Sequence, residues 1–234
     1  MNLMDLKEFS SEFIDSFEFA KFAHQKAFVL TDKEYFDLSG SVKPLMEEIL
    51  PIALLAQHLR TPELQVDVLW FNDSEPRDGK LRLKGKPVEL GFYESEYFLE
   101  VTTAVSPKDY LQREALLKNG SVHGGDNIKR QGKSRSPIIS KPEVRDSNAS
   151  VDRAIQWIID CVRSKASKTY PIPCMLIVNV KPEKVLSVLD WADVFKSVHK
   201  AEIESNFKRI YAIDAYHNAV IALPLYSNSL GQQT

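Results

Sequence analysis

One carboxylate stands inside a segment that has the composition of a β-strand. Residues 97–105 are rich in β-branched and aromatic side chains, which favours a strand. In a strand, Glu100 and Thr102 point to one face while Leu99 and Val101 point to the other. A carboxylate in so apolar a strand is costly to bury unless something pairs with it, and a divalent metal ion is one such partner. Glu100 is therefore the first candidate for chemistry.

Two other acids could share a metal ion with Glu100. Asp67 lies between two valines in residues 64–71, which we expect to form a strand. Glu89 lies in residues 88–93, which we also expect to form a strand, and it precedes Glu100 along the chain. Two carboxylates a few ångströms apart form a hard oxygen site suited to Mg²⁺ or Mn²⁺. The sequence does not decide between the two acids.

The order of the expected elements resembles the core of the PD-(D/E)xK nuclease superfamily, which runs helix, three-stranded meander, helix, strand. The chain offers a comparable order over roughly residues 42–180, with a helix at 42–60, strands at 64–71, 88–93 and 97–105, a helix beginning near Pro107, and a strand at 174–180. In the family the third strand carries Glu-x-Lys. The segment Glu100-Val101-Thr102 matches the glutamate, but threonine stands in the place of the lysine.

The resemblance implies an α/β fold with a restriction-endonuclease-like core, a central mixed sheet flanked by helices, and an N-terminal helical region. It also implies an endonuclease or exonuclease that hydrolyses DNA with Mg²⁺ or Mn²⁺. Glu100 and either Glu89 or Asp67 would bind the metal, which lowers the pKa of bound water and stabilises charge on a phosphoryl oxygen. Glu47 or Glu48 would supply the extra acid that some members place on the preceding helix.

The lysine that is missing at Thr102 could come from elsewhere. Lys108, at the start of the following helix, is one candidate for this role. Lys165 and Lys168 precede Tyr170 and the next strand, an order that also resembles nuclease-fold proteins, although cations are favoured at any helix C-terminus. The missing lysine keeps a second hypothesis open, a catalytically inactive domain of this fold that binds nucleic acid or a protein partner.

Residues 119–150 combine glycines with positive charge. Within 129–145 there are six basic residues and one acid, so we expect a long irregular loop inserted after the active-site strand and helix. Phosphate contacts need only local positive charge. Lys129, Arg130, Lys133 and Arg135 are therefore the candidates for binding nucleic acid, and solvation of a loop is the alternative explanation.

Composition limits the class of protein. The chain has 234 residues, of which 44% are hydrophobic and 26% charged, and its net charge of −2 gives no overall signature of nucleic-acid binding. We expect one domain, with helices over 1–60, the core over 64–180 including the 119–150 insertion, and a helix and strands over 183–226. Cys161 and Cys174 predict buried thiols in a reducing compartment. No signal peptide or membrane helix is predicted, which favours a cytoplasmic protein without a membrane partner.

Overall fold

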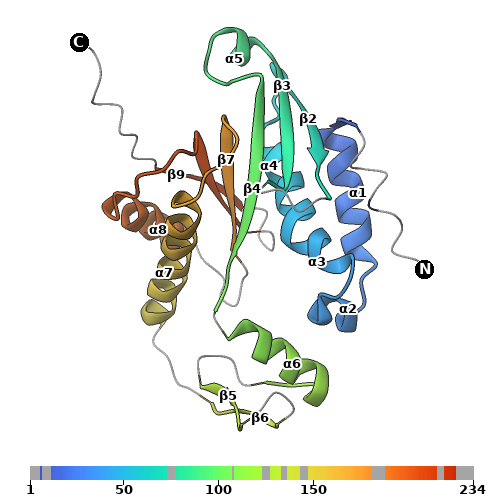
Figure 1. Cartoon of the computed structure of the whole chain (residues 1–234), viewed down its shortest axis with the longest axis vertical. Helices are drawn as coiled ribbons and strands as arrows, with labels where there is room; N and C mark the ends of the chain where they lie inside the picture. The colour runs from blue at the N-terminus through green and yellow to red at the C-terminus, as the bar shows by residue number, and fades with distance from the viewer. Residues whose placement is uncertain are drawn as a thin grey trace.

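The chain forms one seven-stranded mixed sheet with helices on both faces (Figure 1). The computed structural model describes residue 6 and residues 12–72, 77–106, 108–122, 127–132, 136–142, 147–180, 188–214 and 219–224. The sheet has the order β1 (Ile14–Asp15), β2 (Leu64–Trp70), β3 (Gly79–Gly85), β4 (Glu96–Ala104), β7 (Cys174–Val180), β8 (Arg209–Asp214) and β9 (Ala219–Leu223). The expected α/β class, with a central mixed sheet between helices, is confirmed.

The pairing pattern changes at the middle of the sheet. Strands β2, β3 and β4 form an antiparallel meander, β7 and β8 continue the sheet in parallel from β4, and β9 closes it antiparallel to β8. All seven residues of β7 are buried, as the apolar run Cys174–Val180 predicts for a strand covered on both faces. Strand β4 therefore joins the two halves of the sheet, because it pairs antiparallel with β3 and parallel with β7.

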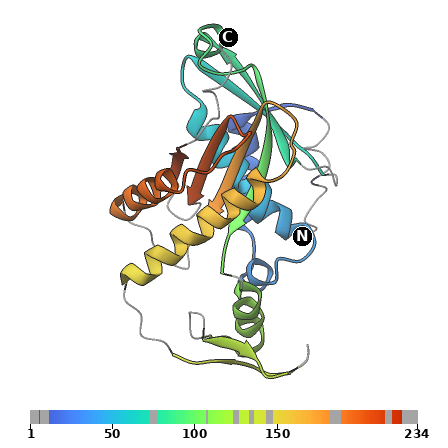
Figure 2. The ribbon, with the colours of Figure 1, turned by 60° about the vertical axis from the view of Figure 1, so that its left-hand side comes forward.

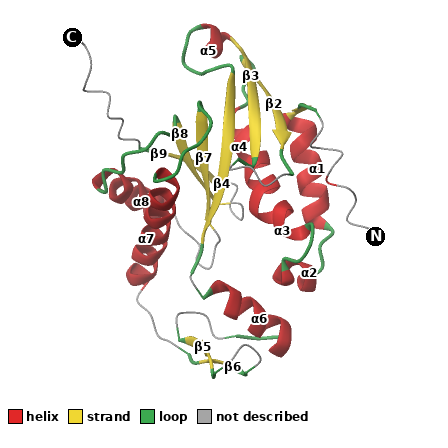
Figure 3. Cartoon of the chain, in the orientation of Figure 1, coloured by secondary structure: helices red, strands yellow, loops and turns green. Residues whose placement is uncertain are grey.

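Two helical layers cover the sheet (Figure 3). The first layer holds α1 (Ser16–Phe28), α3 (Val42–Pro44), a π-helical turn η2 (Leu45–Ile49) and α4 (Leu50–Leu59), and it packs on the face that carries Leu99 and Val101. The second layer holds α7 (Ser147–Ala166) and α8 (Val188–Lys200), which pack on the opposite face. None of the helices in the described part of the chain is long and apolar enough to cross a membrane.

The helix expected over residues 42–60 is present, and the π-turn η2 interrupts it just before Pro51. Proline has no backbone N–H, so it cannot donate the i→i−4 hydrogen bond of a regular helix. The widened turn carries both Glu47 and Glu48. Turns of this kind occur frequently at functional sites.

The strand expected at residues 88–93 is wrong. The middle strand of the meander is β3. Residues 86–89 form a short helix, α5 (Lys86–Glu89), which directly follows β3 in the connection to β4 (Figure 1). Strand β3 has an alternating pattern, in which Leu81 and Leu83 are buried and the three basic residues between and beside them are not. The turn signal of Asp78 followed by glycine concealed this strand.

We expected an irregular loop over residues 119–150, but the described parts of this insertion contain regular secondary structure. It follows α6 (Asp109–Asn119) and contains the hairpin β5 (Ile128–Arg130) and β6 (Ile138–Ser140). Ile128 is fully buried against Leu111 and Ala115 of α6, so these apolar contacts anchor the hairpin. Figures 1 and 2 show this lobe beyond the C-terminal end of β4. Lys133 and Arg135 lie outside the described residues.

Gly85 ends β3 in a backbone conformation that predicts strong sensitivity to substitution. Its φ is +124°, and a Cβ atom there would lie 2.1 Å from the Glu63 carbonyl oxygen. We expect Gly85→Ala to lower the free energy of unfolding by about 2–4 kcal/mol in urea denaturation. Gly91→Ala is the matched control, because Gly91 has φ +76° and open space around it, so only about 1 kcal/mol should be lost. Equal losses in the two variants would contradict the close approach at Gly85.

Candidate active site

The candidate site lies where β4 continues beyond its pairing with β3. Pairing between these strands ends at Gly79 and Leu99, whereas β4 continues to Ala104 along β7. Asp78 takes the place of the missing strand partner. Its backbone N–H donates to the Leu99 carbonyl at 2.8 Å, and its carboxylate Oδ2 accepts from the Val101 N–H at 2.6 Å. The Asp78 carboxylate is thus fixed at the edge of β4, bonded to Val101, the residue that follows Glu100 in the sequence.

Glu100 faces the second helical layer and meets a cation there. Its side chain is buried, with 7% exposed, and forms an ion pair with Lys165 near the end of α7. The Tyr170 hydroxyl is also buried against this carboxylate but does not reach good hydrogen-bond geometry with it. Burial and the neighbouring Glu100 charge raise the pKa of Tyr170, so this phenol stays protonated at neutral pH.

Glu48 contributes a third carboxylate from the π-turn η2. Its Oε2 accepts a hydrogen bond from the Trp70 indole at 3.1 Å, and η2 packs against β4. Burial raises the pKa of Glu48, and the charges of Glu47 and Glu100 raise it further, while the Trp70 bond opposes the rise. Glu48 and Glu100 therefore lie close enough to repel each other.

Asp78 has the most informative electrostatic environment of the group. Burial raises the pKa of Asp78 to about 7, the charges of Glu100 and Glu48 add to the rise, and the Val101 N–H and Lys165 oppose it. Burial, then Glu100 and Asp78, likewise raise the pKa of Cys174 to about 12. Ionisable groups that lie close together and have strongly shifted pKa values are typical of functional sites.

The donor set suits a hard divalent cation. Three carboxylates act on one another here, and Lys165 is the cation that contacts one of them, which leaves negative charge for a metal ion to neutralise. Among the residues that the structure describes, no three acidic, histidine or cysteine side chains form a complete metal-binding group. Mg²⁺ is commonly held by one or two carboxylates with water and substrate phosphate at the other positions. Asp78 and Glu100 fit that smaller requirement.

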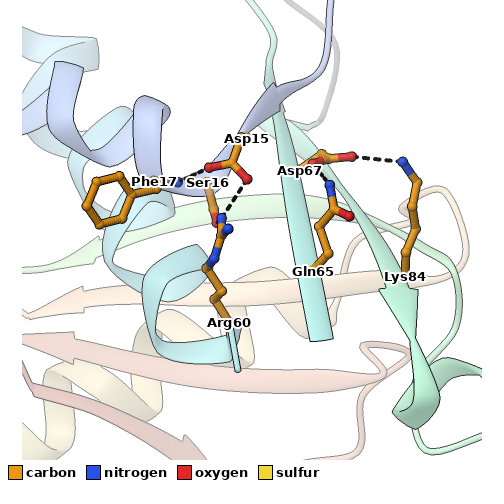
Figure 4. A network of polar contacts seen from close by, with 7 residues as sticks. All are labelled: Asp15, Ser16, Phe17, Arg60, Gln65, Asp67 and Lys84. Carbon is orange, nitrogen blue, oxygen red and sulfur yellow. Dashed lines mark hydrogen bonds and ion pairs between the residues drawn. The ribbon is translucent and has the colours of Figure 1, made fainter. Parts of the chain in front are cut away.

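Neither acid expected beside Glu100 belongs to this group. Asp67 lies on β2, where its Oδ2 pairs with Lys84 and its Oδ1 accepts from the Gln65 amide, both at 3.1 Å (Figure 4). The ion pair with Lys84 therefore satisfies the Asp67 carboxylate, which the sequence had singled out because it stands between two valines. Glu89 is exposed on α5, because the segment expected to be its strand is a helix.

The remaining predicted residues lie near the site or in the insertion. Thr102 shares the Glu100 face of β4 and lies beside the Cys161 thiol, whose pKa burial raises. Lys108 stands just before α6 and lines a pocket with Lys129 of the hairpin, and the lysine on Glu100 is Lys165 instead. Arg130 pairs with Glu114 of α6.

Asp78 is the site residue that the sequence reasoning missed. It stands in Pro76-Arg77-Asp78-Gly79, which was interpreted as part of a turn. The alternation of leucine with lysine and arginine over residues 80–84 is a strand signal that could have revealed β3. An acid at the start of that strand would then have been the natural partner for Glu100.

The raised pKa of Asp78 predicts a specific dependence of stability on pH. The folded chain holds the Asp78 proton more tightly than the unfolded chain, whose ordinary value is 3.8. The contribution of Asp78 is therefore complete below about pH 4 and is lost as the pH rises through about 7. We expect Asp78→Asn, which keeps an acceptor for the Val101 N–H, to be more stable than the wild type at pH 8 by about 1–3 kcal/mol.

Urea denaturation at pH 5 and pH 8 measures this difference. The gain of Asp78→Asn should shrink at pH 5, where the wild-type carboxyl is largely protonated. Asp67→Asn is the matched control, since it removes a charge that Lys84 pairs and should give no gain at pH 8. A loss of stability in Asp78→Asn at both pH values would contradict the repulsion inferred for Asp78.

No protein-family model, curated protein or solved structure matches this chain. The geometry of its own residues is therefore the basis on which a function is inferred.

Proposed function

We propose that this chain is a metal-dependent nuclease with a PD-(D/E)xK-like core, acting on phosphodiester bonds of DNA. The observation that carries the proposal is the proximity of Asp78, Glu100, Glu48 and Lys165 where β4 continues beyond β3. The succession of α4, the β2–β3–β4 meander, α6 and the parallel strand β7 supports it. This succession resembles the restriction-endonuclease-like core, and fold resemblance alone would not give a function.

The proposed metal ligands are Asp78 and Glu100. Asp78 immediately precedes the second strand of the meander and Glu100 lies on the third. The sequence Pro76-Arg77-Asp78 contains a proline and an aspartate, but Arg77 separates them, whereas they are adjacent in the family name. Glu48 is proposed as the additional acid from the helix that precedes the meander.

Lys165 is proposed to do the work of the lysine absent at Thr102. Its ammonium group already contacts Glu100, so a phosphoryl group beside Glu100 would lie within its reach. A fixed cation aimed at developing negative charge stabilises a transition state without reorganisation of solvent. Supply of this cation from α7 rather than β4 agrees with the Thr102 substitution in the motif.

A bound Mg²⁺ or Mn²⁺ would supply Lewis acidity and a more acidic water. The chain's own groups prepare the site for it. Asp78 is oriented by the Val101 N–H, Glu48 by the Trp70 indole, and Glu100 by Lys165. The Asp78 carboxyl, with a pKa of about 7, is able to take up or release a proton near neutral pH. A cation in the site would favour its ionised form.

One observation supports the alternative, an inactive domain of the same fold that binds nucleic acid or a protein partner. Lys165 already neutralises Glu100 without any metal, as in a purely structural ion pair. In an enzyme, Glu100 would have to leave Lys165 or bind it and the metal together when metal enters. In an inactive domain the ion pair could stay unchanged. Asp78 and Glu48 are each held by one hydrogen bond, but within the described residues neither forms an ion pair, although each is buried near the Glu100 charge.

Catalysis can be tested with supercoiled, linear and single-stranded DNA in Mg²⁺, Mn²⁺ or EDTA. We expect cleavage of at least one substrate with metal and none in EDTA. Asp78→Asn and Glu100→Gln keep the shape of each side chain but remove the charge that a metal needs, so each should lower the rate at least 100-fold. Asp67→Asn is the matched control and should cleave at nearly the wild-type rate. Full activity in Glu100→Gln, or no cleavage together with no metal binding in calorimetry, would refute the proposal.

The role of Lys165 has a separate test. Lys165→Met keeps much of the side-chain length without the charge, so it should reduce kcat about 10²–10³-fold through the loss of transition-state stabilisation. Lys165→Arg should restore part of that loss because it returns a positive charge. Metal binding by Lys165→Met, measured by calorimetry, should be unimpaired or tighter since Glu100 loses its internal partner. Unchanged kcat in Lys165→Met would assign the ion pair to stability alone.

A further inference from the structure

The α6–β5–β6 lobe holds a pocket whose charged lining residues are all lysines. The pocket has a volume of about 240 Å³ and is lined by Lys108, Asn127, Ile128, Lys129, Ile139 and Lys141. Among the residues that the structure describes, no carboxylate lines it. At ~30 Å³ for each water of the liquid, this space admits a phosphate group with part of its hydration shell.

The strand register brings the lysines together. Lys129 of β5 pairs directly with Ile139 of β6, so both side chains leave the hairpin on the same face. The Lys141 N–H donates to the Asn127 carbonyl at 3.1 Å, which extends the hairpin beyond the named strands. Within the described residues, neither Lys129 nor Lys141 forms an ion pair, although many other lysines of the chain do.

The hairpin is held firmly enough to present these charges. Arg130, on the other face, makes a two-pronged ion pair with Glu114 of α6 and also donates to the Ser136 carbonyl. Arg130 and then Lys118 lower the pKa of Glu114 to about 2, so this anchor stays ionised over the physiological range. Ile128 adds a fully buried contact. The positive charges of the hairpin therefore divide into an anchoring arginine and outward lysines.

The position of the lobe connects this pocket with the candidate active site. Lys108 follows Thr102 by six positions on the chain that leaves β4, so the two Cα atoms lie within roughly 20 Å of each other at ~3.3–3.6 Å per residue. Figures 1 and 2 both place α6 and the hairpin beyond the C-terminal end of β4. A polyanion bound at the carboxylates beside β4 would have this lobe beside its path.

We infer that Lys108, Lys129 and Lys141 form a second anion site, which binds a backbone phosphate of the nucleic acid a few nucleotides from the bond to be cut. The inference rests on the proposed function for the identity of the polyanion. The three lysines supply positive charge for a phosphate, and phosphate contacts position a strand without selecting its sequence. Isoleucine walls exclude water from one side and strengthen the attraction.

Binding in EDTA separates this site from catalysis. Fluorescence anisotropy with a labelled 24-nucleotide DNA, single- and double-stranded, is measured for the wild type and for Lys129→Ala/Lys141→Ala as a function of salt. We expect at least a 10-fold loss of affinity near 0.1 M salt and a salt slope smaller by one to two phosphate contacts. Lys129→Arg/Lys141→Arg should bind like the wild type. The matched control, Lys196→Ala/Lys200→Ala on α8, removes the same charge from exposed positions and should change little.

The remaining comparisons give decisive outcomes. Repeating the titrations in Glu100→Gln should leave the effect of the lysine variant intact, so failure of catalysis does not affect this result. Inorganic phosphate and pyrophosphate should compete weakly with the oligonucleotide. Tight binding of pyrophosphate, with oligonucleotide affinity unaffected by Lys129→Ala/Lys141→Ala, would overturn the nucleic-acid assignment in favour of a free polyphosphate. Equal salt slopes for the lysine variant and the α8 control would overturn the anion site itself.

Discussion

The hydrogen bond from the Val101 N–H to Asp78 is the interaction on which the candidate site depends. A strand that loses its neighbour exposes backbone donors that must be satisfied. Asp78 satisfies one of them with a side chain instead of a backbone carbonyl, at the point where β4 continues beyond its pairing with β3. The same bond fixes a carboxylate beside Glu100. One hydrogen bond thus both satisfies the edge of β4 and places a second acid there.

The structure maintains this arrangement at a cost in stability. Asp78 and Glu48 are buried near Glu100, and for each of the two the principal effect of burial is to disfavour the charged carboxylate. Folding would favour neutral residues there. Asp67, by comparison, also lies between apolar residues in the sequence, but Lys84 pairs with its carboxylate and compensates its charge. This difference distinguishes Asp78 and Glu48 from an ordinary buried ion pair, and groups with pKa values shifted in this way are more common at functional sites.

The sequence predicted the elements whose burial pattern is strong and local. The runs around Glu100 and Cys174 gave β4 and β7 almost to the residue, and Glu100 was recognised because a carboxylate in an apolar strand needs a partner. Its actual partner could not be predicted, because Lys165 is 65 positions away and reaches Glu100 only through the packing of α7 on the sheet. Asp78 was missed for a different reason, since turn-forming residues overlap the first residue of β3.

The same distinction applies to Lys108, one candidate for the lysine absent at position 102. Proximity in sequence suggested it, and it lies just before α6, whereas the lysine that contacts Glu100 is Lys165. Helix α7 returns across the sheet after the whole insertion and brings Lys165 to the buried carboxylate. Under the proposed function, the positive charges of the helix and of the insertion would have separate roles. Lys165 would act on the phosphoryl group at the carboxylates, while Lys108 and its hairpin neighbours would bind a more distant phosphate of the same strand. A substrate that spans the two sites would be held at two points along one backbone, which orients the bond to be cut before any chemistry begins.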